Sequence, residues 1–211
     1  MSPGLSIFVL VVILVVGWFA LGTHINIRKG HRFLEWLQGG LPLIGEKTTL
    51  RWLGSSVVHL KIEKAREPFR RAEVLIVLEP RDVPLLWLFS RLRGRRDLLI
   101  VRTELRTLPG MQIEVLDRHA WSTQAVAREV KQLDWHLQST VDNQPFQIYF
   151  SPPAPNAGEL IAEARGCELP LVRVGVRRTN NSLEVQWSLP SRPACGSRAV
   201  FETIQRVAHR I

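Results

Sequence analysis

The chain has 211 residues and a formal net charge of +9; 45% of its residues are apolar and 22% are charged. This length and composition allow a substantial core and exclude global disorder, and two cysteines are too few for a disulfide-stapled scaffold. The basic excess favours anionic partners.

The amino-terminal segment is apolar. Residues 1–27 contain no Lys, Arg, Asp or Glu, and residues 5–21 are almost wholly hydrophobic. About 17–20 helical residues cover most of a bilayer core of about 30 Å. We therefore expect a transmembrane anchor over residues 1–27 that contacts the membrane through residues 5–21. A cleaved signal peptide is the alternative, because Ala20-Leu21-Gly22 resembles a cleavage site, although no basic residue precedes the apolar run.

The charged residues that follow predict the orientation. Arg28, Lys29 and Arg32 come directly after the apolar segment, and basic flanks favour the cytoplasmic side. Residues 28–110 carry 17 Lys/Arg against 9 Asp/Glu, whereas residues 111–211 carry 11 against 10. We expect a single-pass membrane protein with its soluble part in the cytoplasm and its basic half near anionic lipid.

Residues 28–47 are predicted to connect the anchor to the domain, as a short helical piece ended by Gly39-Gly40 and Pro42. The stretch GGLPLIGEKTT resembles a phosphate-binding loop. However, Glu46 separates Gly45 from Lys47, and strand-rich sequence follows where a helix is needed. We expect no nucleotide cofactor.

Strand patterns dominate the next part of the chain. Apolar and polar residues alternate in 57–63, which predicts a half-buried strand. Residues 48–52 are a further strand signal, separated from it by Gly54-Ser55-Ser56, and 73–79 is a continuous apolar strand. Residues 98–105 and 111–116 are expected to form a hairpin, followed by a helix over 122–133.

The carboxyl-terminal part again contains a hairpin that is followed by a helix. A strand is expected over 146–150, a helix over 157–166, a hairpin over 171–189 and an amphipathic helix over 197–211. The predicted class is α+β: one transmembrane helix, then a mainly antiparallel or mixed sheet with packed helices and a carboxyl-terminal amphipathic helix. We expect a soluble domain over 48–211, with 48–134 and 135–211 as candidate subdivisions.

The candidate binding site lies in VPLLWLFSRLRGRRD, residues 83–97, where an aromatic and aliphatic block meets four arginines. Such a block suits a bilayer surface, with apolar side chains among acyl chains and guanidinium groups on phosphates. Two alternatives are a core element whose arginines pair with Glu79, Asp82 and Asp97, and a groove for a protein partner. The expected membrane- or partner-binding residues are Trp87, Phe89, Arg91, Arg93, Arg95 and Arg96.

No catalytic motif is evident, and the six histidines show no metal-ligand spacing. The pairs Asp117/His119 and Asp134/His136 are spaced so that each pair would share one face of a strand, which is a weak hint of a reactive site. A basic chain could also bind nucleic acid, but no nucleic-acid-binding motif is present. We expect no metal, no catalytic residue and a binding or scaffolding role, with an accessory subunit of a membrane complex or a membrane-tethered enzyme as alternatives.

Overall fold

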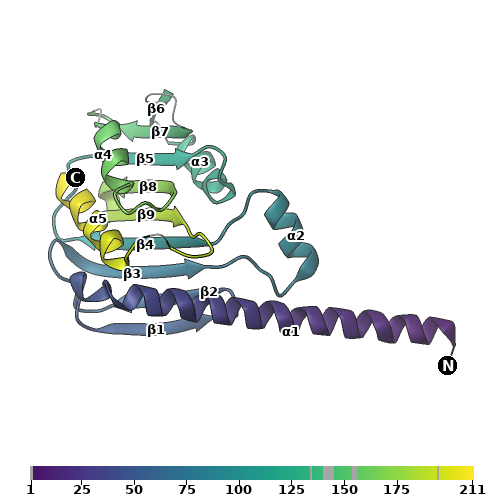
Figure 1. The fold of residues 1–211 in the computed structure, drawn as a ribbon. Helices are drawn as coiled ribbons and strands as arrows, with labels where there is room; N and C mark the ends of the chain where they lie inside the picture. Colours follow the sequence, from purple (N-terminus) through teal and green to yellow (C-terminus); the bar gives the residue numbers. More distant parts are fainter. Residues whose placement is uncertain (1, 134, 140–144, 154–155, 194) are drawn as a thin grey trace.

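A computed structural model describes residues 2–133, 135–139, 145–153, 156–193 and 195–211. It consists of one long amino-terminal helix and a domain built on a single nine-stranded sheet, which confirms the predicted α+β class (Figure 1). The helices are α1 (Pro3–Gln38), α2 (Pro84–Leu92), α3 (Gln124–Val130), α4 (Ala157–Ala164) and α5 (Ser197–Arg210). The strands are β1 (Thr48–Leu53), β2 (Val57–Ile62), β3 (Phe69–Val77), β4 (Leu98–Leu105), β5 (Gln112–Asp117), β6 (His136–Ser139), β7 (Phe146–Ser151), β8 (Leu171–Arg177) and β9 (Ser182–Ser188).

The sheet order is β1-β2-β3-β4-β9-β8-β5-β7-β6, and each of these neighbouring pairs is antiparallel. The hairpin predicted over 171–189 is confirmed as β8–β9. The strands expected over 48–52 and 57–63 pair with each other as β1–β2, and Gly54 supplies the positive φ of the turn between them. The hairpin predicted over 98–116 is wrong. Strand β4 pairs with β3 and β9, and β5 pairs with β7 and β8, because the β8–β9 hairpin inserts between β4 and β5.

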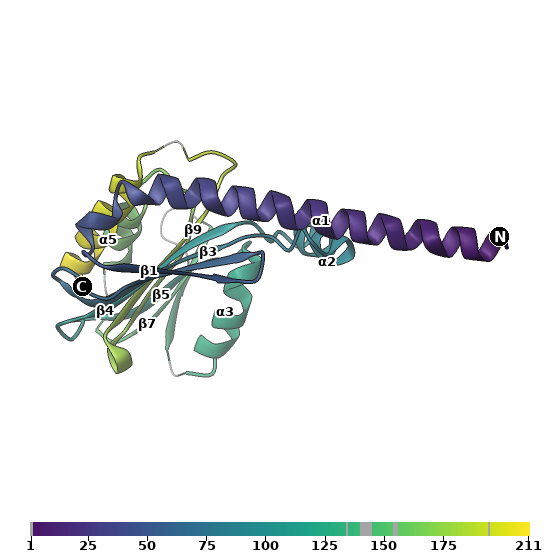
Figure 2. The same cartoon turned by 90° about the horizontal axis from the view of Figure 1, so that it is seen from below.

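Helices α1, α4 and α5 cover one face of the sheet, whereas α3 lies on the opposite face (Figure 2). The core between the sheet and the three helices contains the wholly buried Phe33 of α1, Phe201 of α5 and Trp187 of β9. The indole Nε1 of Trp187 donates to the carbonyl of Ala164 at 2.9 Å, so this large side chain is buried without an unpaired donor.

Helix α1 has two halves with different surroundings. Its amino-terminal half is apolar and exposed, and its most apolar 18-residue stretch has no buried part. Its carboxyl-terminal half packs on the domain, and residues 28–38, expected to be a separate connector piece, continue the same helix without a break. The helix ends at Gly39, as the glycine pair predicts. A rigid helix therefore joins the apolar segment to the domain, because no loop intervenes.

Two glycines allow α1 to approach the domain closely. A Cβ on Gly22 would lie 2.5 Å from the carbonyl carbon of Arg81, and a Cβ on Gly30 would lie 2.5 Å from the ring of Trp52. Real Cβ atoms do not approach other atoms this closely, so a side chain at position 22 would displace the Arg81 backbone, and one at position 30 would require the Trp52 ring to move.

Candidate functional site

Helix α2 starts and ends at local signals in the sequence. Pro84 occupies the first turn, where its missing N–H costs no hydrogen bond. Gly94 adopts a positive φ of 80° just after the helix, and its N–H donates to the carbonyl of Arg91 at 3.0 Å. Both views show α2 beside the middle of α1, displaced from the sheet towards the amino-terminal end (Figures 1 and 2).

The apolar face of α2 points away from the domain. Leu85 and Leu92 are 81% and 78% exposed, and Leu88 and Phe89, which share their face at helical spacing, are also exposed. On the opposite face Ser90 is buried, and Trp87 and Arg91 reach the polar residues behind the helix. This polarity is the reverse of an ordinary surface helix, which buries its apolar side.

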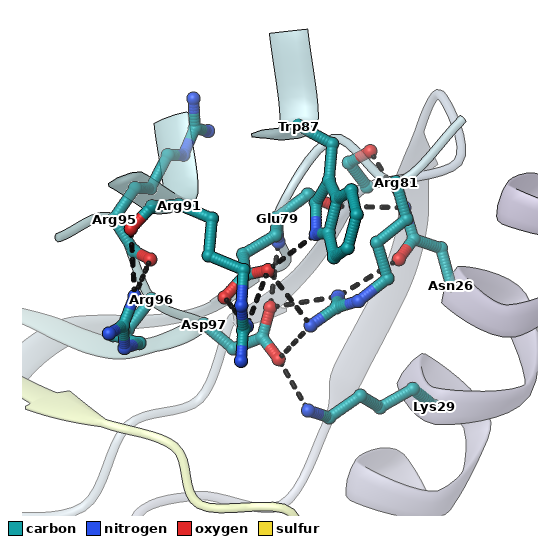
Figure 3. Close-up of polar contacts among 10 residues, drawn as sticks. Asn26, Lys29, Glu79, Arg81, Trp87, Arg91, Arg95, Arg96 and Asp97 are labelled. Atoms are coloured by element: carbon teal, nitrogen blue, oxygen red, sulfur yellow. Dashed lines mark hydrogen bonds and ion pairs between the residues drawn. The ribbon is translucent and has the colours of Figure 1, made fainter. Parts of the chain in front are cut away.

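The polar residues behind α2 centre on two buried carboxylates, Glu79 and Asp97, whose exposures are 2% and 3% (Figure 3). Carboxylates this deeply buried need partners, since desolvation of an unpaired charge costs several kcal/mol. The partners come from α1, α2 and the segment after β3. We call the set the interhelix cluster; its members are Asn26, Lys29, Glu79, Arg81, Trp87, Arg91 and Asp97.

Glu79 is held by α2. Trp87 Nε1 donates to Glu79 Oε2 at 2.8 Å, and Arg91 Nη1 donates to both carboxylate oxygens at 3.1 and 3.2 Å. An ion pair with Arg81 at 3.4 Å completes its surroundings. These contacts fix which face of α2 turns inward.

Asp97 is held by the segment after β3 and by α1. Arg81 donates to its two oxygens at 3.0 Å each, the backbone N–H of Glu79 donates at 2.7 Å, and Lys29 forms an ion pair with it. Burial pushes the pKa of Asp97 upward, but the bonds from Arg81 and Lys29 outweigh burial and hold that pKa below its ordinary value. The carboxylate is therefore charged at neutral pH.

Asn26 links the cluster to α1. Its Nδ2 donates to the carbonyl of Glu79 at 3.0 Å and to Ser56 Oγ at 3.2 Å, and its Oδ1 accepts from Arg81 at 3.1 Å. Closer to the amino terminus, Trp18 Nε1 donates to the Arg81 carbonyl at 3.0 Å. The orientation of α2 relative to α1 is thus set by directional bonds.

The structure separates the six expected binding residues into three pairs. Trp87 and Arg91 face inward and bind Glu79. For Arg91 this agrees with the alternative in which an arginine of this segment pairs with that carboxylate. Phe89 and Arg93 lie outward, with the guanidinium 4.0 Å from the ring centroid. The other two expected residues are Arg95, which stacks on Trp121 at 5.2 Å, and Arg96, which donates to backbone carbonyls.

Asn26, Glu79 and Trp18 were missed as site residues. The signal that could have found Asn26 is an amide at the edge of an uncharged apolar run, where a polar side chain needs a partner. Glu79 was named only as a partner in the core alternative, because sequence does not show which arginine reaches it.

A hollow of about 360 Å³ lies next to α2, on the sheet face that α3 shares. Its floor includes Leu98 and Ile100, and Arg95, Arg96 and His119 lie at its edge. His119 is 74% exposed, and its ring lies 3.6 Å from Asp117. The His119 side chain is therefore largely in contact with solvent.

Of the second predicted pair, Asp134 and His136, the structure describes only His136, because Asp134 lies outside the described residues. His136 of β6 is exposed and lies 5.7 Å from the Phe150 ring. Within the described ranges, no group of three or more His, Cys, Asp and Glu side chains could hold a metal ion. Comparison of the chain with protein-family models and with curated protein sequences gave no match.

Proposed function

We propose that this chain is a single-pass membrane protein with a non-catalytic binding or scaffolding role, whose cytoplasmic domain is held against an anionic lipid surface. The observation that carries the proposal is the outward apolar face of α2, fixed beside the apolar half of α1. A soluble domain rarely leaves a contiguous apolar helix face exposed unless something covers it.

The depth of α2 follows from helix geometry. A bilayer core of about 30 Å takes about 20 helical residues, which from Pro3 extend to Gly22. Trp18 lies four residues earlier, or about 6 Å inside that boundary. Trp87 of α2 packs on Trp18 with ring centroids 6.1 Å apart. The exposed leucines of α2 therefore meet the zone between head groups and acyl chains, where interfacial helices lie.

The charges around α2 support a membrane surface as the partner. Arg93, Arg95 and Arg96 follow the helix, and none of the three forms an ion pair with an acidic side chain in the described parts of the chain. Arginines beside an apolar helix face bind lipid phosphates while the apolar side chains enter the acyl layer. Arg28, Lys29 and Arg32, which follow the apolar half of α1, favour the cytoplasmic orientation.

An accessory-subunit role is the second candidate, because an exposed apolar helix face also fits a groove on a membrane-embedded protein. The two candidates differ in what contacts Leu85 and Leu92. Acyl chains reach these residues in the first case, whereas a second polypeptide covers them in the other.

The test uses the full chain in liposomes, since the contacts of Gly22 and Asn26 make the middle of α1 part of the domain. A small fluorophore is attached to Leu92→Cys, or to Leu108→Cys as control, both in a Cys195→Ser background; the remaining Cys167 is wholly buried. Leu108 is exposed and lies in the connection after β4, at the far end of that strand from α2. Phospholipids brominated on the acyl chain should quench the probe at 92 and leave that at 108 unaffected.

Equal quenching at the two positions would contradict the lipid contact. Shielding at position 92 together with stoichiometric co-purifying chains would favour the accessory-subunit role. The Leu108→Cys variant also reports orientation. A membrane-impermeant thiol reagent should label it in inside-out vesicles and leave it unlabelled in intact cells, and the reverse pattern would place the domain outside.

A further inference from the structure

A second hollow, of about 660 Å³, lies on α1 just beyond its apolar half and is separate from α2. It opens between α1 and the segment after β9, where Ser191 forms part of its wall. Basic side chains dominate the lining, with apolar residues at the end nearest the apolar helix. The residues that set its chemistry are Leu21, His24, Ile25, Arg28, Arg32 and Arg81.

The basic side chains form a continuous stripe on the helix. His24, Arg28 and Arg32 follow one another at intervals of four residues, so they share one face. Like charges at this spacing destabilise an isolated helix. No Asp or Glu among the described residues lines the hollow, so no acidic side chain of the lining offsets that repulsion. An anion bound against the stripe would offset it.

Two of the arginines are available to a ligand. Lys29 and Arg81 at the back of the hollow are both bonded to Asp97. Arg28 and Arg32 are exposed and form no ion pair with any acidic residue that the structure describes. The adjoining interhelix cluster adds to the positive potential, because its three basic side chains outnumber its two carboxylates.

The hollow also has the right depth for a lipid. Leu21 and Ile25 lie on either side of Gly22, where the hydrocarbon core ends if α1 spans the membrane from Pro3. Arg28 lies six residues, or about 9 Å, beyond that boundary, and its long side chain can reach back to the phosphate layer. The same hollow thus offers apolar contacts below and guanidinium groups above.

We propose that this hollow is a defined binding site for one anionic phospholipid, with the lipid phosphate between Arg28 and Arg32 and the start of its acyl chains on Leu21 and Ile25. The proposal rests on the proposed function, because the lipid is reached only if α1 spans the bilayer. It adds a discrete head-group site to the diffuse contact that α2 makes.

The test is native mass spectrometry of the full chain in neutral detergent, with phosphatidylglycerol or phosphatidylcholine added. We expect one retained phosphatidylglycerol and weak retention of phosphatidylcholine. Arg28→Gln/Arg32→Gln should weaken phosphatidylglycerol binding by at least about tenfold, since each of the two charges near a lipid surface contributes a factor of about five. The matched control, Arg70→Gln/Arg71→Gln, removes two exposed charges at the opposite end of β3 and should bind as the wild type does.

A second variant leaves the charge unchanged. Ser191→Trp places a large side chain in the wall of the hollow and should lower phosphatidylglycerol binding in the same way, with thermal unfolding in lipid-free detergent as the check on folding. Equal phosphatidylglycerol retention by the double arginine variant and the wild type would overturn the site, as would equal retention of the two lipids by the wild type.

A competition arm identifies the source of the phosphate. Free glycerol phosphate should fail to displace the lipid at concentrations where phosphatidylglycerol saturates the site, because it lacks the contacts to Leu21 and Ile25. Displacement at equal concentration would assign the hollow to a soluble phosphate instead. Loss of this site with quenching at position 92 intact would reject only the hollow, and retention of the lipid without quenching would reject only the α2 contact.

Discussion

Trp18 and Trp87 pack against each other at a centroid distance of 6.1 Å and an interplanar angle of 45°. Trp18 belongs to the apolar half of α1, and Trp87 is the residue of α2 that binds the buried Glu79. The pair therefore connects the apolar helix to the interior of the domain through one continuous set of contacts. This connection gives a fixed position to α2, and the proposed membrane contact depends on that position.

Gly22 is the point where α1 has no room for a side chain. We expect Gly22→Leu to push α1 away from Arg81, because its Cβ would overlap the Arg81 backbone. Loss of the neighbouring Asn26 bonds should increase amide exchange at Glu79 and Leu78, measured by hydrogen–deuterium exchange of the full chain in detergent. Gly17→Leu is the matched control, since a Cβ there meets no atom within 4 Å. Equal exchange in the two variants would show that the close approach is unimportant.

Arg91 and Arg93 are two residues apart and differ in what they contact. Arg91→Gln removes a charged donor from buried Glu79 and should lower the free energy of unfolding by about 1–2 kcal/mol, a value reduced because half of the Arg91 side chain is exposed. Arg93→Gln should change stability by less than about 0.5 kcal/mol. Urea unfolding in detergent measures both, and similar losses would contradict the assigned roles.

Asp97 should make the domain sensitive to acid. Its folded pKa lies below its unfolded value of about 3.8, so its contribution to stability is complete above that value and is lost as pH falls through the folded pKa. We expect the stability difference between the wild type and Asp97→Asn to be constant above about pH 5 and to shrink below about pH 4. Thermal unfolding at a series of pH values tests this, and a difference that grows on acidification would refute it.

The sequence was sufficient where structure depends on near neighbours. The apolar helix, the strands β1 and β2, the β8–β9 hairpin and the end of α1 at Gly39 follow from composition, alternation and turn residues. The hairpin expected over 98–116 failed for a different reason. Its two strands have the right pattern, but a strand pattern does not identify its partner, and here the later β8–β9 hairpin lies between them.

Residues 83–97 likewise combine features that the sequence shows with contacts that depend on the fold. Its apolar block and arginines were recognisable, and tight local signals at Pro84 and Gly94 are consistent with the short helix observed. Which arginine is structural was not readable from the sequence. Arg91 differs from Arg93 only because the sheet brings Glu79 beneath one face of α2.

By itself, the sequence determined that this protein has a long apolar helix, an α+β domain and a basic half next to that helix, because hydrophobic periodicity and charge are local properties of the chain. Only the tertiary structure decided that α1 is rigidly joined to the domain and that α2 turns its apolar side outward. The physical reason is burial: Asn26, Glu79, Arg81 and Asp97 are distant in sequence, and each needs the others as partners once the fold removes them from water.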